Sequence, residues 1–332
     1  MENSIKTQVQ EILVENGLDF KIEKEGLYRI KNLELILNLE NGALRGTCYE
    51  PKPTPYFGLV NTKSDNTINS VKEGYKVSQN HEILELALRG MQNFGDDLSI
   101  SKAGSLNDGR KVFIQLKIDG KRKIGNDKLT QYVTIIDSND GSTSLSIGIG
   151  DKCARCLNEY FKFYKAGNAK FRHTATLEQK LRTIPMLIET ALAENLRQIR
   201  LYEMFASTPI TRELANGLVK AMLGHDRVLT SMDVRATKSA RSINIMDSLY
   251  NDIEKEFNDI RKISNTTYDT VWGLFNGATR FTTHTQVAPK RENGREEGLM
   301  NGTSYKLNQL ALEYCESQLT PTQMAYVNFD NN

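Results

Sequence analysis

Glycines with the spacing of a phosphate-binding loop occur in the segment Gly104-Ser-Leu-Asn-Asp-Gly109-Arg110-Lys111. A P-loop continues with Lys and then Ser or Thr, whose hydroxyl holds magnesium, and it opens a helix whose N-terminus binds the phosphate. Here Arg110 and Lys111 take those two positions, and the next residues alternate as in a strand. The segment therefore lacks the features on which nucleotide binding depends.

Two acids and four histidines are the other candidates for chemistry. Asp137 and Asp140 lie in the run Asp-Ser-Asn-Asp-Gly, which could seat a cation, although carboxylates at a hairpin tip are more often turn formers. A metal-dependent nuclease built on this pair is one alternative. The histidines have no Cys, Ser or carboxylate partner at motif spacing, and they are His81, His173, His225 and His284. We therefore expect no enzyme and no catalytic residue.

Cys153 and Cys156 form a C-x-x-C motif. Structural zinc needs four converging ligands, and the chain has no second C-x-x-C and no H-x-x-x-H motif. The pair shares helical spacing with Leu157 and Tyr160, which predicts thiols packed in a core, with a zinc or redox site as the alternative. We expect no metal and no cofactor. Four cysteines in 332 residues fit a reducing compartment better than a disulfide framework.

The elements that would position these residues lie between Leu98 and Tyr164. Turn signals of Asn, Asp and Gly separate four short strands, because these residues favour the positive φ of tight hairpins. A helix over 152–164 is expected to follow and to pack on the sheet through its apolar stripe. The predicted fold class is α+β, an antiparallel β-meander packed on a helix (a β-β-β-α core), with a small N-terminal sheet and a helical C-terminal half.

Alternation with period two assigns the faces of these strands. One face of the strand at 110–118 is aliphatic, with Val112, Ile114, Leu116 and Ile118. The other face is basic with an aromatic, with Lys111, Phe113, Gln115 and Lys117. On the last strand, Ser144, Ser146 and Gly148 form a small polar face that a ligand backbone could approach closely. The sequence thus predicts one core face and one open basic face.

Four regions are expected along the chain. Residues 1–50 form a small α/β element with a helix over 3–16, and the proline-rich run at 50–55 reads as an extended connector. The central core covers 57–175. Residues 176–318 form a helical region, with helices near 177–202, 211–223, 239–263 and 304–317. Residues 319–332 are expected to lack order.

The formal net charge of +2 hides an uneven distribution. Residues 101–130 carry an excess of five positive charges, and residues 152–182 an excess of six. Two basic segments in a near-neutral chain indicate a polyanion site, with a solvated charged face as the alternative. The composition, 39% hydrophobic and 25% charged, is typical of soluble globular proteins, and no apolar run could span a membrane. A cytoplasmic protein without a membrane partner is expected.

Six short pieces of the chain resemble a phage- and plasmid-borne family catalogued as domain of unknown function 932, also called the phage/plasmid-like protein family. They occur in the family's order within residues 75–315: Tyr75-Lys-Val-Ser-Gln-Asn80, Gly104-Ser-Leu-x-x-Gly109-Arg110-Lys-Val-Phe-Ile-Gln115-Leu, Ser138-Asn-Asp-Gly-Ser142, Cys156-Leu-Asn158, Arg172-His-Thr174 and Gly302-Thr-Ser-Tyr-x-Leu-Asn308. The chain departs from the family at Asn139, where the family usually has His, and at Cys153, near a usual Arg. The resemblance implies a phage-like setting and no particular activity.

The expected core is also similar in topology to single-strand annealing recombinases. We therefore expect an ATP-independent protein that binds and anneals single-stranded DNA as a homo-oligomeric ring or filament, in the host cytoplasm, with a host or phage single-strand binding protein as a further partner. Lys and Arg would neutralise phosphates while aromatic rings stack or shape the groove. The expected DNA-binding residues are Lys102, Arg110, Lys111, Phe113, Lys117, Lys121, Arg122, Lys123, Tyr132, Lys152, Arg155, Lys162 and Arg172. The alternative is an oligomeric phage structural or host-interaction protein without nucleic-acid activity.

Overall fold

The computed structural model describes residues 2–39, 42–92, 98–107, 109–155, 157–163, 170–224, 240–264, 269–286 and 294–328. The strands are β1 (Ile22–Leu39), β2 (Gly42–Asn61), β3 (Asn66–Lys72), β4 (Leu98–Leu106), β5 (Lys111–Ile124), β6 (Asp127–Ser138), β7 (Leu145–Cys153), β8 (Glu159–Phe163), β9 (Lys170–Phe171), β10 (Pro209–Ile210) and β11 (Asp269–Thr270). The helices are α1 (Glu2–Glu15), α2 (Asn80–Met91), α3 (Leu177–Leu181), α4 (Ile184–Ser207), α5 (Arg212–Leu223), α7 (Ala240–Ser264), α8 (Val271–Arg280), α9 (Gly294–Asn301), α10 (Thr303–Glu316) and α11 (Pro321–Val327), with a π-helical turn at Phe281–Thr285.

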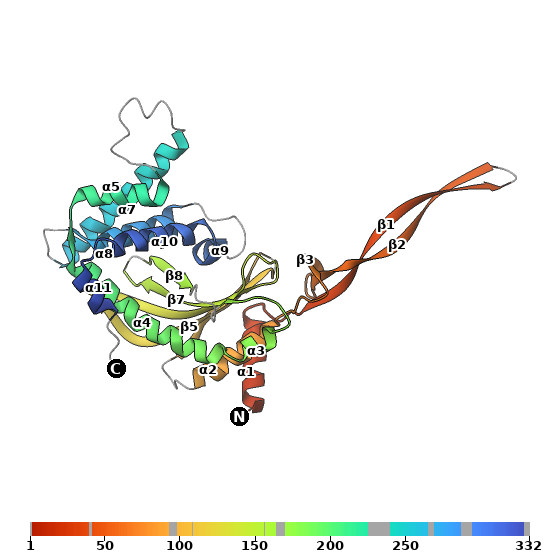
Figure 1. Ribbon diagram of the computed structural model, residues 1–332, viewed down its shortest axis with the longest axis horizontal. Coiled ribbons are helices and arrows are strands. Elements are labelled where there is room, and N and C mark those ends of the chain that lie inside the picture. The colour runs from red at the N-terminus through yellow and green to blue at the C-terminus, as the bar shows by residue number, and fades with distance from the viewer. Residues whose placement is uncertain are drawn as a thin grey trace.

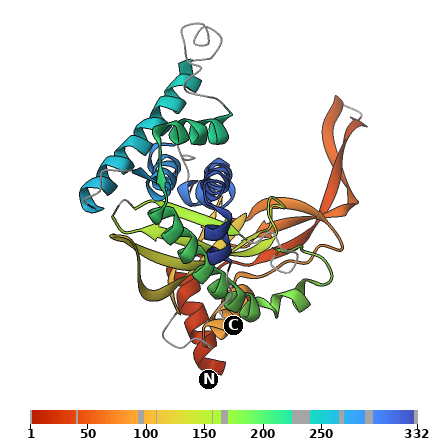
Figure 2. The same ribbon diagram turned by 60° about the vertical axis from the view of Figure 1, so that its left-hand side comes forward.

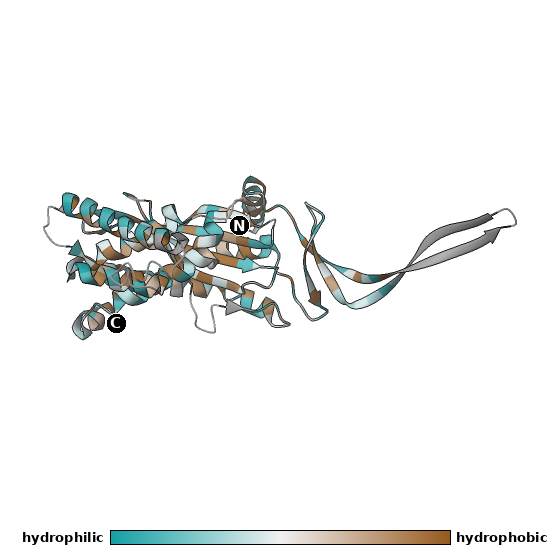
Figure 3. Ribbon diagram, turned by 90° about the horizontal axis from the view of Figure 1, so that it is seen from above, coloured by the Kyte–Doolittle hydropathy of each residue, from teal (hydrophilic) through white to brown (hydrophobic). Residues whose placement is uncertain are grey.

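The molecule consists of a body and a long arm (Figure 1). The body holds a sheet with the order β4-β5-β6-β7-β8, and β9 pairs with β7. The arm is the antiparallel ribbon of β1 and β2, and β3 pairs with β2 at its base. Seen from above, the ribbon twists as it leaves the body (Figure 3). The predicted α+β class, with antiparallel sheets and helices in the C-terminal half, is confirmed.

The meander from β4 to β7 is confirmed, and so is its core face. Val112, Ile114 and Leu116 are buried in one cluster with Val133 and Ile149 of the neighbouring strands. Helices α1, α2 and the first half of α4 add further residues to that cluster at helical spacing. Burial of this face therefore fixes the register of the central strands.

The C-terminal helices form a second cluster beyond the sheet, where α4 passes from one cluster to the other. Figure 2 shows α4 in green crossing the sheet, with the blue and teal helices gathered on one side. The predicted helices at 211–223, 239–263 and 304–317 correspond to α5, α7 and α10. Pro185 lies in the first turn of α4, and the helix predicted near 177–202 is divided there into α3 and α4. None of the described helices is long and apolar enough to span a membrane.

One prediction near the end of the chain is wrong. The tail expected to lack order contains α11. The hydroxyl of Thr320 accepts a hydrogen bond from the backbone N–H of Gln323, whose side chain accepts from the backbone N–H of Thr320. This capping box, with Pro321 in the first turn, starts α11.

The helix predicted over 152–164 is also wrong. Cys153 ends β7, and β8 returns as an antiparallel strand that pairs Gly148 with Phe163. A side chain at Gly148 would collide with the carbonyl oxygen of Lys162. The small polar face that was expected to receive a ligand backbone therefore receives the backbone of β8.

The arm replaces the short strands and the connector predicted between residues 20 and 55. The proline-rich run lies within β2, where Pro51 pairs with Ile30 and Pro53 pairs with Tyr28. Alternate prolines favour an extended backbone, which a strand can use where the missing N–H groups point away from its partner. The boundary expected at this run therefore falls inside a strand.

Candidate nucleic-acid interface

The predicted basic face of β5 is covered. Phe113 is 0% exposed and Lys111 is 6% exposed, although both lie on the face opposite the main core. Phe113 belongs to a small cluster with Phe163 of β8 and with Leu299 and Met300 of α9. The expectation of an open basic face with an available aromatic is therefore wrong, because β8 and α9 pack against it.

Two of the predicted DNA ligands form ion pairs with α9. The Nζ of Lys111 lies 2.9 Å from a carboxylate oxygen of Glu297, and both side chains are buried. Lys102 pairs with Glu296 and lies over the ring of Phe113, with its Nζ 5.7 Å from the ring centroid. Both cations hold α9 against the sheet.

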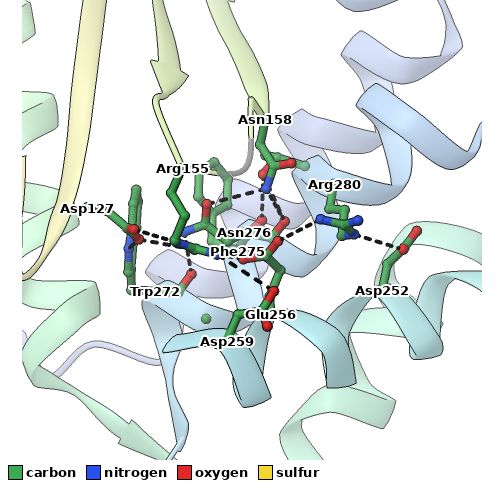
Figure 4. Close-up of polar contacts among 12 residues, drawn as sticks. Asp127, Arg155, Asn158, Asp252, Glu256, Asp259, Trp272, Phe275, Asn276 and Arg280 are labelled. Atoms are coloured by element: carbon green, nitrogen blue, oxygen red, sulfur yellow. Dashed lines mark hydrogen bonds and ion pairs between the residues drawn. The ribbon is translucent and has the colours of Figure 1, made fainter. Parts of the chain in front are cut away.

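Arg155 is part of an interior network that links the sheet to α7 and α8 (Figure 4). Its guanidinium lies 2.6 Å from Asp127 and 2.8 Å from Glu256, whose side chain is fully buried. Trp272 donates its indole N–H to Asp127 at 2.9 Å, and Arg280 pairs with Glu256 at 3.2 Å. Burial acts to lower the pKa of Arg155, but its hydrogen bond to Asp127 and the charge of Glu256 raise it. Arg155 is thus an internal cation.

The other predicted residues are spread over the body. Lys152 pairs with Glu159 at 2.9 Å, and burial lowers the pKa of Lys162. Three more side chains are partly buried: Arg110, Lys117 and Tyr132. The side chain of Lys121 lies outside the described residues. Besides Lys102, three predicted cations are exposed, and they are Arg122, Lys123 and Arg172.

Four exposed cations lie near the turn of the β5–β6 hairpin. Arg122 and Lys123 lie at the end of β5, and Lys123 pairs across the hairpin with Lys128. Asn126, in the turn between them, donates its side-chain N–H to the backbone carbonyl of Ile263 at 2.9 Å. That contact brings the exposed Lys262 of α7 beside the hairpin. We call this surface, formed by Arg122, Lys123, Lys128 and Lys262, the basic end.

No ion pair within the described part of the chain involves a cation of the basic end. The acid of α7 that precedes Lys262 most closely in sequence is Asp259. Its carboxylate lies 4.0 Å from the guanidinium of Arg155, which offsets part of the negative charge of Asp259. Neither Lys128 nor Lys262 is among the residues predicted from the sequence to bind DNA. The basic last turn of α7 was the available signal for Lys262, but its position beside the hairpin depends on packing.

Arg172 lies at the other end of the sheet. It follows β9, which pairs with Leu145 at the start of β7, whereas the basic end adjoins the last residues of β7. Nine residues of strand separate these positions, a distance of about 27 Å at the rise of an extended chain. Arg172 and the basic end therefore do not form one surface.

A buried histidine cluster lies beside Arg172, at the base of the arm. The ring of His173 stacks on Tyr75, with centroids 4.8 Å apart and planes 6° from parallel. Its Nδ1 lies 2.9 Å from the carbonyl oxygen of Lys76, and its Nε2 lies 2.9 Å from Asp137. A cavity of about 540 Å³ adjoins the cluster and is lined by Tyr75, Gly141, Ser142, Thr143, Ser144, Arg172, His173 and Thr174.

Both ring nitrogens of His173 therefore face acceptors. A carbonyl oxygen and an ionised carboxylate can only accept hydrogen bonds, so the arrangement favours the doubly protonated imidazolium. Burial acts to lower the pKa of His173, but the hydrogen bond and charge of Asp137 outweigh burial and raise it. Ser78 also donates its hydroxyl to Asp137. The cluster ties the segment after β3 to β6 and to the residues after β9.

This geometry does not suit the nuclease alternative. Asp137 is 1% exposed, and its two oxygens accept from His173 and Ser78. Ser78 donates to the carboxylate rather than to the histidine, so the three groups lack the arrangement of an activated serine. Within the described ranges, no three His, Cys, Asp or Glu side chains converge as metal ligands. Cys153 is buried in the second core cluster, whereas Cys156 lies outside the described residues.

A second buried acid lies between the sheet and α4. Asp151 accepts hydrogen bonds from the side-chain N–H of Gln131 at 2.9 Å and from the hydroxyl of Tyr202 at 2.8 Å. Burial raises the pKa of Asp151 to about 6, although both hydrogen bonds act to lower it. Asp151 is buried, so its titration affects the stability of the fold.

Comparison with known proteins gives one match. The model of a family described as domain of unknown function (DUF932) matches residues 67–308. No curated protein and no solved structure matches the chain. The matched range includes β3, the whole meander, the histidine cluster and most of the helical region, and it excludes β1 and β2.

Proposed function

The chain belongs to the family described as domain of unknown function (DUF932), and because that description supplies no activity, we propose a function from the surface of the molecule. The proposal is that this protein binds nucleic acid without catalysis, and that single-stranded DNA is the form it holds for annealing. The observation that carries it is the basic end.

Three properties of the basic end support the proposal. Its four cations are exposed and come from the β5–β6 hairpin and from α7, which a hydrogen bond between Asn126 and Ile263 holds together. They have no partner acids among the described residues, unlike Lys102, Lys111 and Arg155. Ile263, 43% exposed, adds an apolar contact beside the cations. Unpaired cations on a fixed support suit a phosphate backbone, whose neutralisation releases counterions.

The basic end makes a testable prediction about affinity. The double substitution Lys123→Glu with Lys128→Glu should abolish most binding of a single-stranded oligonucleotide, measured by fluorescence anisotropy across a salt series. Removing one of these lysines alone should flatten the slope of log affinity against log salt by about 0.7. Both side chains are exposed, so the fold should survive, which circular dichroism can check.

A matched control is the double substitution Lys6→Glu with Lys72→Glu. Both lysines are exposed, and they lie on α1 and β3, away from the basic end. This variant has the same net charge as the first and should bind as the wild type does. Equal loss in the two variants would mean that overall charge, and not the basic end, governs binding.

Annealing itself needs a separate assay. Two complementary labelled strands should pair faster with the protein than without it, in the absence of ATP and magnesium, because base pairing supplies the free energy. The variant with Lys123→Glu and Lys128→Glu should lose the acceleration. Binding without acceleration would restrict the proposal to single-strand binding.

The second candidate is an oligomeric structural or interaction protein. The arm favours it, since a long ribbon that extends from the body has no role in the first proposal by itself (Figure 1). The two candidates differ in the salt series: the second predicts no oligonucleotide binding by the wild type. The two candidates are compatible, because an annealing protein is itself expected to self-associate into a ring or filament that binds nucleic acid.

A further inference from the structure

The arm is an isolated ribbon along most of its length. β1 pairs with β2 from Tyr28 opposite Pro53 out to Leu39 opposite Gly42, and β3 reaches only as far as Tyr56. Among the described residues, β1 has β2 as its sole strand partner. Two-stranded ribbons are marginally stable in water unless another element supports them. The arm therefore presents backbone edges that can pair with a further strand.

The two edges of the ribbon differ because of three prolines. Pro51, Pro53 and Pro55 alternate along β2, and the first two lie opposite Ile30 and Tyr28. A proline fits such a ladder only where its missing N–H would point away from the partner strand. The outer edge of β2 therefore lacks donors at three alternate positions between residues 51 and 55, which disfavours pairing of another strand with that part of the edge.

The outer edge of β1 has no such block. β1 contains no proline in its 18 residues. Tyr28 and Ile30 lie opposite prolines, so their own N–H and C=O groups point outward, and Asn32 and Glu34 continue the same alternation. Tyr28 is 60% exposed and Ile30 is 61% exposed, which places apolar side chains beside the open edge. The edge therefore has both the hydrogen-bonding groups and the apolar area for strand addition.

The chemistry of the arm favours a second copy of this chain as the added strand. Residues 22–61 contain five Lys/Arg and five Asp/Glu, so two arms do not repel each other and the arm has no excess charge for a polyanion. Antiparallel pairing of two β1 edges is isologous, because each strand offers the other the same groups. The arm projects beyond the body in Figure 1, so pairing about a two-fold axis leaves the two bodies at opposite ends.

We propose that two copies of this protein join through the outer edge of β1, with the two β1 strands antiparallel and the two ribbons forming one four-stranded sheet. The residues from Tyr28 to Leu39 give each strand about 40 Å of edge. The prolines of β2 disfavour further strand addition at residues 51–55, the part of its outer edge next to β3. This surface is separate from the basic end and does not depend on nucleic-acid binding.

Sedimentation velocity across a dilution series measures dimerisation and tests the interface. The test uses a variant of β1 that loses only backbone N–H groups pointing away from β2. The double substitution Asn32→Pro with Glu34→Pro should convert the dimer to a monomer, because both N–H groups point away from β2. Its matched control, Asn32→Ala with Glu34→Ala, changes the same two side chains but keeps the N–H groups, and it should remain a dimer. A wild type that stays monomeric at every concentration, or a double-proline variant that dimerises normally, would overturn the proposal.

The two introduced prolines could disturb the pairing of β1 with β2, so amide hydrogen exchange of the wild-type protein provides a second test. In the wild-type dimer, the outward amides of Tyr28 and Ile30 should be protected, and the protection should disappear on dilution. Fast exchange of these amides in a sample that sediments as a dimer would mean that another surface forms the dimer. Oligonucleotide binding by the same samples is measured separately, so loss of dimerisation and loss of binding are distinguishable.

Discussion

At the scale of single residues, the sequence identifies charges but not their partners. Lys111 occupies the predicted face of β5, yet its partner Glu297 lies 186 positions further along the chain. Arg155 and Glu256 are 101 positions apart. Period-two alternation tells which side of a strand a residue occupies, and it gives no information on what covers that side. Lysines that were predicted to bind DNA are therefore divided between buried ion pairs and an exposed end.

The buried pair of Lys111 and Glu297 leads to a stability prediction. Lys111→Ala should lower the free energy of unfolding by about 3 kcal/mol, because it leaves the charge of a buried carboxylate without its cation. Lys102→Ala, which removes the cation of the more exposed pair with Glu296, should cost less than about 1 kcal/mol. Urea denaturation measures both values. Equal costs would show that the two pairs are not differently buried.

Asp151 leads to a prediction about pH. Its folded-state pKa of about 6 is above the ordinary value of 3.8, so the folded state binds the proton more tightly. The resulting stability is present below the ordinary pKa and is lost as pH rises through about 6. Asp151→Asn removes the buried charge and can still bond both Gln131 and Tyr202. The variant should be more stable near neutral pH by about 3 kcal/mol, at 1.36 kcal/mol per pKa unit.

The control for Asp151→Asn is Asp140→Asn, at a partly exposed position in the turn after β6. Its denaturation midpoint should stay within about 0.5 kcal/mol of the wild type at both acidic and neutral pH. A variant at Asp151 that is no more stable than the wild type near neutral pH would contradict the assignment of a buried, charged carboxylate.

At the scale of elements, hydrophobic periodicity predicts those helices and strands that bury one face. The helices at 211–223, 239–263 and 304–317 and the strand from Lys111 were all predicted from spacing, because each buries one face. β8 was missed, since Cys153, Leu157 and Tyr160 also fit helical spacing and only the return across Gly148 makes the segment a strand. The arm was missed because prolines usually end a strand, and here they lie where no donor is needed.

The close approach of β8 to Gly148 of β7 predicts that a methyl group added at this position destabilises the protein. Gly148→Ala should destabilise the body by about 1 to 3 kcal/mol, because the added carbon meets the backbone of Lys162 and Phe163, which cannot rotate away. Gly74→Ala is the control, since nothing lies within 4 Å of its added carbon, and it should stay within about 0.5 kcal/mol of the wild type. Thermal unfolding of both variants gives the comparison, and two equal midpoints would contradict the close approach of β8.

At the scale of the whole molecule, the fold separates two surfaces. The basic end lies at the far end of the β5–β6 hairpin, and the arm leaves the body next to β3 and the histidine cluster. The sequence predicted a polyanion site on a basic face and a homo-oligomer, and no local pattern indicated the surface through which copies would join. Their positions depend on long-range contacts of α7, α9 and β3.

The most direct test of nucleic-acid binding is to map where the strand lies. Photo-crosslinking of a single-stranded oligonucleotide to the wild-type protein, followed by mass spectrometry of the peptides, identifies the residues in contact. The account predicts crosslinks in the peptides that contain Arg122 to Lys128 and Lys262, and their loss at high salt. Crosslinks confined to the arm or to the surface around Arg172, or no crosslink at any salt concentration, would contradict it.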